Sequence, residues 1–271
     1  MVIKGKVFIV TGASSGIGKQ LSKSFAKSGA HVVCAARRKD HIDSLSDSIK
    51  SFGGSSLAVQ TDVTILKECA NMIEKTMELY GRIDCLVLNA GISMWSKFEK
   101  ITNIEFFDDL IKVNYLGAVN CCYTALPHLK KTNGKIVSTS TAQALIGFPN
   151  HSGYVASKHA LHGFLSTLAM EHRGEISVLE AVLSWIRGTN LRNNAFEFDG
   201  SKDIKTLKKH TKESVSLNDC VEKIIQAIKD EKREIYIPGK LRLLPFLNLF
   251  FKNYLERKVK SAIDENIVTE E

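Results

Sequence analysis

The sequence predicts an α/β fold, with three layers formed by a doubly wound parallel sheet of about seven strands and helices on both faces. Short apolar runs alternate with amphipathic stretches along the chain. Glycine and polar turns separate these runs, and no break in composition divides them. The 271 residues, 44% of them hydrophobic, are enough for one large core. We therefore expect one domain over residues 1–240, followed by a hydrophobic and basic extension over 241–271.

The chain opens with a strand, a glycine turn and a helix. The strand KVFIV (6–10) precedes TGASSGIG (11–18), and an amphipathic pattern follows. Glycines let the backbone approach a pyrophosphate, and N–H groups at a helix start face its negative charge. The turn predicts a dinucleotide phosphate site, and an ordinary strand–helix connection is the alternative. The residues expected there are Gly12, Ser14, Ser15, Gly16, Ile17 and Gly18.

The second strand (31–36) ends without the acidic residue that would bind the two ribose hydroxyls of NAD. Ala36 stands at that place, and Arg37 and Arg38 follow it. Two guanidinium groups favour a 2′-phosphate, so we expect NADP(H) as the cofactor. A solvated arginine pair at a strand end is the alternative interpretation.

A polar helix (40–52) and a third strand (57–59) precede Asp62 and Val63, which we also expect at the cofactor. An Asp after a strand either caps the next helix or contacts the adenine amine, and both interpretations stay open.

A helix (67–80) leads to the apolar run 85–88, which is typical of a strand buried on both faces. Asn89, Ala90 and Gly91 follow, and such small residues leave room for a planar ligand at the edge where parallel sheets bind cofactors.

A long helix is expected over 104–129, with Asn114 in its middle. Asparagine competes for backbone hydrogen bonds there, so a buried Asn114 needs a partner. A bridging water or a backbone carbonyl at a local distortion would serve, and a purely structural role is equally open.

The next strand (135–139) opens into Ser140 and Thr141, and a helix begins near Ser152. Tyr154 and Lys158 lie four residues apart on that helix and hence on one face. A phenol beside a fixed positive charge has a lowered pKa and exchanges protons more readily. The pair predicts a catalytic centre, with a chance pairing on a helix surface as the alternative.

The last units are a strand (176–183), a polar stretch (188–214), a helix (217–229) and a strand (234–238). The polar stretch lacks apolar periodicity, which predicts a mobile lid or substrate loop.

Charge and cysteine usage exclude several classes of protein. The net charge is +8, but no basic run is interleaved with aromatic residues, so we expect no nucleic-acid partner. The six cysteines form no C-x-x-C pair and lie mostly in apolar segments, which predicts reduced, buried thiols and no metal site. A strand that starts near residue 6 leaves no room for a secretory signal. We expect a cytoplasmic protein, with the cytosolic face of a membrane such as the endoplasmic reticulum as the alternative location.

Together these motifs make the chain similar to the short-chain dehydrogenase/reductase family over residues 6–239. The stretch ALPHLK (125–130) and the long C-terminal tail resemble the branch of 11β-hydroxysteroid dehydrogenases and related microsomal reductases. The segments 97–99 and 114–117 also resemble 3-ketodihydrosphingosine reductases. The resemblance implies a Rossmann fold, and Arg37 resembles the family's NADP-preferring pattern.

The resemblance implies an oxidoreductase that interconverts a carbonyl and an alcohol. Tyr154 would exchange a proton with the substrate oxygen, and Lys158 would lower the phenol pKa and bind the nicotinamide ribose. Asn114 would hold a water of a proton relay. The family's substrate-orienting serine stands thirteen residues before the tyrosine, where this chain has Thr141, with Ser140 just ahead of it. Either hydroxyl can act.

A second departure from the family lies at LSWIRGT (183–189), where a Pro-Gly pair is usual. Ile186 is expected to cover the nicotinamide edge, and Thr189 to contact a phosphate one residue late. Trp185 is expected in the core, with a pocket wall as the alternative. These departures suggest an alternative function, a catalytically silent NADP(H)-binding or scaffold protein, against which Tyr154, Lys158 and Asn114 argue.

Loops on the cofactor's open side carry apolar residues, which predict a bulky apolar substrate such as a steroid, retinoid or keto-lipid, with packing against the body as the alternative. These residues are Met94, Trp95, Phe98, Leu145, Ile146 and Phe148.

The tail LRLLPFLNLFF (241–251) is too short to span a bilayer and precedes basic residues. A membrane patch, an oligomer contact and a flap over the substrate are the alternatives, and the basic flank favours peripheral membrane association. We also expect a homo-oligomer.

Overall fold

The computed structural model describes residues 1–202 and 214–264. Seven parallel strands form one sheet in the order β3-β2-β1-β4-β5-β6-β9, which confirms the predicted doubly wound fold. The order reverses between β1 and β4, and ligands bind at such a switch point in open α/β sheets. The strands are β1 (Val7–Thr11), β2 (His31–Ala36), β3 (Ser55–Gln60), β4 (Cys85–Leu88), β5 (Lys135–Thr141), β6 (Ser177–Leu183) and β9 (Glu234–Ile237).

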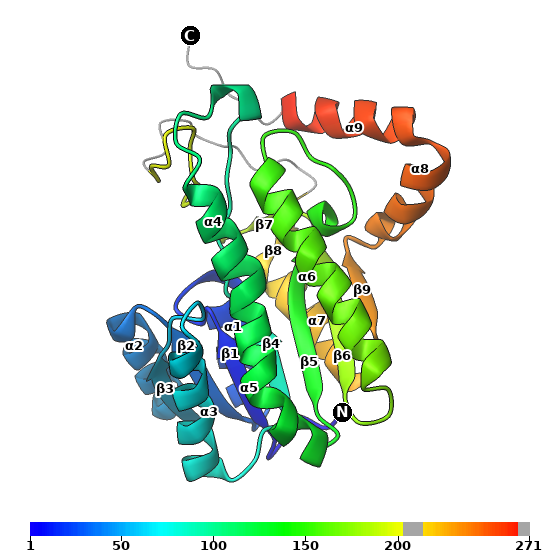
Figure 1. Cartoon of the computed structure of the whole chain (residues 1–271). Helices are drawn as coiled ribbons and strands as arrows, with labels where there is room; N and C mark the ends of the chain where they lie inside the picture. The colour runs from blue at the N-terminus through cyan, green and yellow to red at the C-terminus, as the bar shows by residue number, and fades with distance from the viewer. Residues whose placement is uncertain (203–213, 265–271) are drawn as a thin grey trace.

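Helices cover both faces of the sheet (Figure 1). Apolar residues of α1, α2 and α7 pack on one face, and those of α3, α5 and α6 on the other. The helices are α1 (Gly16–Lys27), α2 (Lys39–Ser51), α3 (Leu66–Tyr80), α5 (Gly117–Lys131), α6 (Ser152–Glu171) and α7 (Leu217–Lys229). Short 3₁₀ turns cover Phe98–Lys100, Ala142–Ala144 and Gly239–Leu243.

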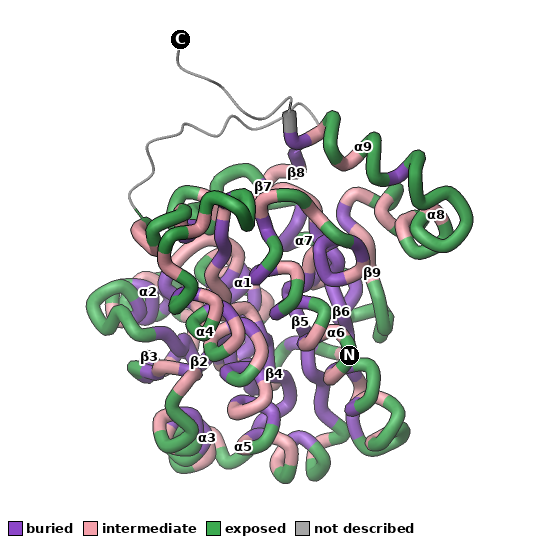
Figure 2. Tube along the Cα trace, turned by 45° about the horizontal axis from the view of Figure 1, so that its top comes forward, coloured by how far each residue is buried: buried purple, intermediate pink, exposed green. Residues whose placement is uncertain are grey.

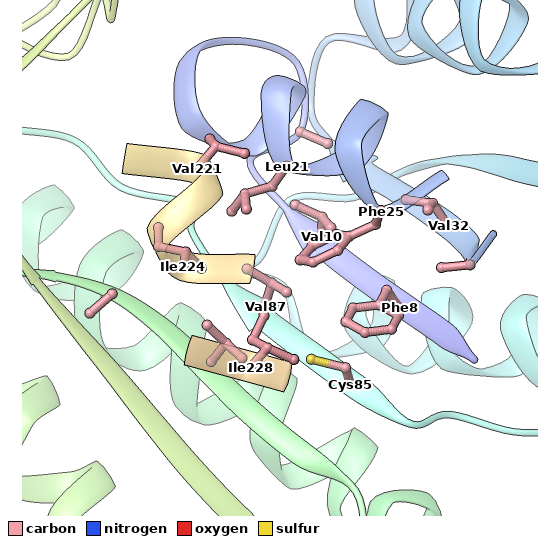
Figure 3. Packing of buried hydrophobic residues seen from close by; sticks show 14 of the residues in the cluster. Phe8, Val10, Leu21, Phe25, Val32, Cys85, Val87, Val221, Ile224 and Ile228 are labelled. Carbon is pink, nitrogen blue, oxygen red and sulfur yellow. The ribbon is translucent and has the colours of Figure 1, made fainter. Parts of the chain in front are cut away.

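The core follows the alternation of the strands. In β1, Phe8 and Val10 face α1 and α7, whereas Val7 and Ile9 face the opposite helix layer. The rings of Phe8 and Phe25 lie 4.4 Å apart between centroids, within the cluster drawn in Figure 3. Both layers are therefore anchored on strands that are buried on both sides.

The helix expected over 104–129 begins later and is distorted at Asn114. It consists of α4 (Phe106–Ile111), a π-helical turn (Lys112–Leu116) and α5. A π-helical turn inserts one residue into a helix and is frequent at functional sites.

The chain after β6 folds back over the carboxyl ends of the strands. Two short strands, β7 (Ile186–Arg187) and β8 (Val215–Ser216), pair with each other. The backbone of Phe196 bonds to Ser93 and Trp95, so residues 188–202 pack against that loop. Of the polar stretch 188–214 that we expect to act as a lid, residues 203–213 lie outside the described part.

Two helices end the described chain, α8 (Leu244–Phe250) and α9 (Lys252–Asp264). Figures 1 and 2 place them at the same end of the molecule as β7 and β8. Leu249 is 75% exposed and Phe250 63%, whereas Leu255 and Ile263 are buried. Among the described residues, no helix is long and apolar enough to cross a membrane. The boundary at residue 240 stays a prediction.

All six cysteines are free and buried, which confirms the prediction of buried thiols. Burial raises the pKa of the Cys34, Cys122 and Cys220 thiols to about 12. These groups are thus poor nucleophiles in the folded protein.

Candidate active site

A cavity of about 620 Å³ lies where the loops that follow the strands meet. The predicted catalytic side chains Tyr154, Lys158, Thr141 and Ser140 line it. The predicted cofactor residues on its wall are Gly12, Ser14, Ser15, Gly16, Ile17, Arg37, Arg38, Asp62, Val63, Asn89, Ala90, Gly91, Ile186 and Thr189. Gly18 and Asn114 are not part of the wall and lie behind it.

The glycine turn is seated on the end of β4. Gly12 has a φ of +65°, and a Cβ there would lie 2.8 Å from Ala90 Cα. A Cβ on Gly18 would lie 2.4 Å from Asn89 Nδ2. That amide nitrogen donates to the Thr11 and Gly12 carbonyls at 3.0 and 3.2 Å. Glycine is therefore required at both positions by close packing.

The start of α1 is suited to an anion. Ser15 is its N-cap residue and makes no side-chain cap bond, and the first turn has no acidic residue. The first N–H groups of a helix have no partner within the helix, and the helix dipole favours negative charge beside them. Residues of this turn on the cavity wall fit the pyrophosphate of a dinucleotide.

The cavity wall has three cationic side chains, two of which directly follow β2. Arg37, Arg38 and Lys202 are all on the wall. The Nη2 atom of Arg38 donates to Ser14 Oγ at 2.9 Å and Ser15 Oγ at 3.1 Å. The sequence does not indicate Lys202 as a site residue, because it lies in a polar stretch far along the chain from the two arginines. Burial and then the charge of Arg37 lower the pKa of Lys202.

Asp62 closes a local turn and also faces the cavity. Its Oδ1 accepts from the N–H and the hydroxyl of Thr64 at 3.0 and 2.8 Å. The N-cap residue of α3 is Ile65, so Asp62 does not cap that helix in the strict sense. Asp62 is on the cavity wall, and its expected contact with the adenine amine stays a prediction.

Burial acts in opposite directions on Tyr154 and Lys158. Both side chains are 6% exposed, and Lys158 Nζ lies 5.9 Å from the phenol ring centroid. Burial raises the pKa of Tyr154, which is opposite to the direction that the resemblance implies. Burial lowers the pKa of Lys158 to about 8, against the raising effect of Glu180. Burial thus favours the protonated phenol, which is the form that donates a proton in carbonyl reduction.

Asn114 is buried with its amide fully engaged. Its Oδ1 accepts from Ile92 N–H, and its Nδ2 donates to the Ile92 carbonyl, both at 2.9 Å. Nδ2 also donates to Ser157 Oγ at 2.9 Å. The sequence suggests either a water or a backbone carbonyl as the partner of Asn114. In the structure the partner is the Ile92 carbonyl, and Asn114 itself lies in the π-helical turn. A Cβ on Gly91 would lie 3.2 Å from Asn114 Oδ1 and 3.8 Å from Lys158 Nζ, so both groups converge there.

The two candidate hydroxyls differ in accessibility. Ser140 is 4% exposed, whereas Thr141 is half-buried at the end of β5. Thr141 Oγ1 accepts from Gln143 N–H at 3.3 Å, which is a long bond. The hydroxyl of Thr141 is thus the more available to a ligand.

A buried carboxylate lies behind Lys158. Glu180 is 6% exposed, and its Oε2 lies 2.7 Å from His162 Nδ1, one helical turn after Lys158. Its other oxygen has no hydrogen-bond partner among the described residues. The hydrogen bond to Glu180 raises the pKa of His162. Sequence reasoning missed Glu180 because it stands in an apolar strand pattern.

The substrate end differs from the prediction. None of the six predicted apolar residues lines the cavity, since Met94 is fully buried and Phe98 is 66% exposed. Trp185, expected in the core, is half-buried on the wall, because β7 turns the chain over the sheet. The wall also has residues not predicted from the sequence, among them Gln143, His151, Asn190, Leu191, Arg192 and Asn194.

No cluster of three or more His, Cys, Asp or Glu that could hold a metal occurs within residues 1–202 and 214–264. The cavity wall provides a phenol, an ammonium group, hydroxyls and an anion-binding turn.

The family model for short chain dehydrogenase matches residues 6–200. Together with the glycine turn and the Tyr154/Lys158 pair in one cavity, this match shows that the chain belongs to the short-chain dehydrogenase/reductases, a family of oxidoreductases that bind nicotinamide dinucleotides. Within that family it belongs to the branch of 11β-hydroxysteroid dehydrogenase-like proteins. The protein 11-beta-hydroxysteroid dehydrogenase-like 4A of Arabidopsis thaliana is 31% identical over 262 residues, 95% of this chain and 85% of that protein. A Dictyostelium discoideum protein named dehydrogenase/reductase SDR family protein 7-like is 30% identical over 259 residues, 93% and 80% of the two chains.

Solved structures agree on the fold. An alcohol dehydrogenase from Thermococcus sibiricus complexed with 5-hydroxy-NADP has a TM-score of 0.73 at 24% identity and covers 85% of this chain and 95% of its own. A short chain dehydrogenase/reductase from Burkholderia phymatum in complex with NAD has a TM-score of 0.75 at 21% identity, with coverage of 90% and 94%.

Proposed function

We propose that the protein is an NADP(H)-dependent oxidoreductase that interconverts a carbonyl and a secondary alcohol on a bulky apolar substrate, of the class of steroids, retinoids or keto-lipids. The observation that carries the proposal is that Tyr154, Lys158 and two hydroxyl side chains line the same cavity as the glycine turn. Carbonyl reduction needs a proton donor beside a nicotinamide site, and this cavity can hold both.

The preference for NADP(H) is inferred from the adenosine end. Ala36 leaves no carboxylate for the ribose hydroxyls, and Arg37, Arg38 and Lys202 supply positive charge. The similar solved structures include complexes with either type of cofactor, so the preference rests on these residues. We expect kcat/KM for NADPH to exceed that for NADH at least tenfold, and Arg37→Ala to lower only the former. A preference for NADH would contradict this assignment.

The chain's own residues supply the proton and orient the substrate. NADPH, when bound, supplies the hydride for the carbonyl carbon. Tyr154 donates its phenol proton to the carbonyl oxygen as negative charge develops there, and in oxidation the phenolate form of Tyr154 accepts the alcohol proton. Lys158 as an ammonium group stabilises the resulting phenolate by its charge. Asn114 holds the loop at Ile92 and, through a water, connects Lys158 to solvent for return of the proton.

Thr141 is the hydroxyl that we assign to orient the carbonyl oxygen. It stands thirteen residues before Tyr154 and is more exposed than Ser140. Thr141→Ala should reduce kcat about 10- to 100-fold, as expected for loss of one hydrogen bond in the transition state. Ser140→Ala should stay within a few-fold of the native rate. The reverse order would assign the role to Ser140.

NADPH oxidation with a panel of steroid, retinoid and keto-lipid carbonyls tests the activity. We expect turnover of at least one class, and its loss in Tyr154→Phe with NADPH affinity unchanged. Tight NADPH binding without any turnover would instead favour the alternative, a silent NADP(H)-binding or scaffold protein.

We also propose peripheral contact of α8 with a membrane surface, and a homo-oligomer. The exposed apolar side chains of α8, followed by the basic residues of α9, support the first. Light scattering after size-exclusion chromatography tests the second, and a monomeric mass would refute it.

A further inference from the structure

Arg192 is half-buried, and its guanidinium group has no hydrogen-bond partner in the described protein. Its Nε and both Nη atoms are covered and make no hydrogen bond among the described residues. Burial lowers the pKa of Arg192. A buried guanidinium with unsatisfied N–H groups is costly unless a ligand or an anion completes it.

Two indole rings hold the guanidinium. Arg192 Cζ lies over the Trp95 ring at 5.4 Å from its centroid and over the Trp185 ring at 4.9 Å. Cation–π attraction offsets part of the burial cost but uses only the guanidinium faces. The N–H donors point along the edges of the guanidinium plane, where they need an acceptor.

The backbone around Arg192 is also fixed. Asn194 N–H donates to the Asn190 carbonyl at 3.0 Å, and Val215 N–H donates to the Trp185 carbonyl at 3.1 Å. Trp95 N–H donates to the Phe196 carbonyl at 2.8 Å. The chain that follows Arg192 is thus bonded to Trp95, and Trp185 is held by β8, so the backbone on both sides of the guanidinium group is fixed.

This position belongs to the substrate end of the cavity. Trp95 contacts His151 at 4.9 Å between ring centroids, and His151 lies 6.2 Å from the Tyr154 ring. Arg192 and Tyr154 both line the cavity, and aromatic contacts connect them. A substrate whose carbonyl reaches Tyr154 can extend toward the guanidinium.

We propose that Arg192 forms a carboxylate-binding subsite, so that the substrate is an apolar carbonyl compound that also bears a carboxylate. The carbonyl group of this substrate rests on the proposed function, whereas its carboxylate is inferred from Arg192 independently of that function. A single guanidinium matches a single negative charge. A planar carboxylate accepts two parallel N–H bonds along the guanidinium edge, which the cation–π contacts with the two indoles do not use.

Binding of decanoate and of 1-decanol to the full-length protein with NADP⁺ present, measured by isothermal titration calorimetry, tests the subsite without turnover. We expect decanoate to bind about 10- to 100-fold more tightly than 1-decanol, the range for a hydrogen-bonded charge. Arg192→Met should abolish this preference, and Arg192→Lys should restore only part of it because the fork geometry is lost. Arg192→Met also removes a buried charge, so we expect it to fold.

Arg187→Met is the matched control, since Arg187 is an exposed arginine on β7. Equal affinities for decanoate and decanol would overturn the proposal, and so would an equal loss in Arg187→Met. A loss of NADP⁺ affinity in Arg192→Met, of the same factor as the loss of decanoate affinity, would assign the guanidinium to the cofactor and also overturn it. Arg192-dependent decanoate binding in a protein that reduces no carbonyl would support the subsite while the proposed function fails.

Discussion

At the scale of single residues, the catalytic pair combines two groups that burial affects in opposite ways. Burial keeps the Tyr154 phenol protonated, and it brings the pKa of Lys158 to about 8. A buried ammonium group is costly for folding but provides a positive charge beside the phenol, where phenolate forms. We infer that this part of α6 lowers the folding stability of the protein because its residues are placed for catalysis.

Lys158→Met should therefore stabilise the protein at pH 7 and abolish its activity. The pKa of Lys158 is about 8 in the fold and 10.5 otherwise, so the unfolded chain binds more protons between these values. The free energy of unfolding of the native protein should rise with pH across this window. The variant gains about 3 kcal/mol at pH 7, from 1.36 kcal/mol per pKa unit. Urea unfolding at pH 7 and 10 measures the difference, which should shrink at pH 10. An unchanged difference would contradict the assignment.

Glu180→Gln should move the alkaline limit of activity to lower pH. The charge of Glu180 raises the pKa of Lys158, so its loss lets the ammonium group deprotonate earlier. A shift of about one pH unit is expected for an opposite charge at short range. The pH profile of kcat between 6 and 10 measures it.

Glu175→Gln is the control for that profile, because Glu175 also pairs with a histidine, His172 at 2.8 Å, but on the surface. Its profile should match the native one. The same shift in both variants would indicate a general charge effect.

At the scale of elements, the glycine turn and β4 form one unit through Asn89. Gly18→Ala would push a methyl group to 2.6 Å from the Gly12 carbonyl and 2.4 Å from Asn89 Nδ2. We expect a loss of about 1–3 kcal/mol in stability, as for overpacking, and NADPH affinity lowered at least tenfold. Calorimetric unfolding and NADPH titration measure both.

Gly163→Ala, in α6, is its counterpart, since a Cβ there meets nothing within 4 Å. Helix propensity alone should stabilise that variant by about 1 kcal/mol. A Gly18→Ala protein with native NADPH affinity would refute the importance of this contact.

The sequence alone predicts those elements whose structure depends on a local pattern. The strand predicted over 85–88 coincides with β4, because both faces of this strand are buried and its residues are all apolar. The distortion at Asn114 was one of the alternatives, since a polar residue in an apolar helix needs a partner. The pairing of β7 with β8 was missed, because it depends on a contact between segments almost thirty residues apart.

At the scale of the whole molecule, the two halves of the cavity differ in how well they could be predicted. The half that we expect to bind the cofactor is lined by glycines and arginines that follow strand ends, a pattern that can be recognised in the sequence alone. The substrate half is formed by residues brought together from distant loops, such as His151 and Arg192. In sequence, Arg192 looks like any solvated arginine, and only the fold reveals that its guanidinium nitrogens are covered and make no hydrogen bond with the described residues.

The exposed face of α8 should bind anionic vesicles. Leu249→Ser with Phe250→Ser should lower the fraction that co-sediments with phosphatidylcholine/phosphatidylserine vesicles, because both side chains are more than half exposed. Tyr123→Ser, at a 70% exposed site on α5, is the control. A native protein that does not sediment with these vesicles would refute the proposed membrane contact.

All six thiols are buried, so their reaction with an added reagent can be used to detect when the folded protein opens. A thiol reagent such as dithionitrobenzoate reacts with thiolates, and the raised pKa values of Cys34 and Cys220 suppress that form while the protein is closed. Labelling of these two sites therefore requires a local or global opening, and its rate reflects the population of open molecules. Cys34 lies on the strand that leads to the arginine pair, and Cys220 lies on α7. Mass-resolved labelling with and without NADPH can thus map, in the unmodified protein, which regions a bound cofactor holds closed.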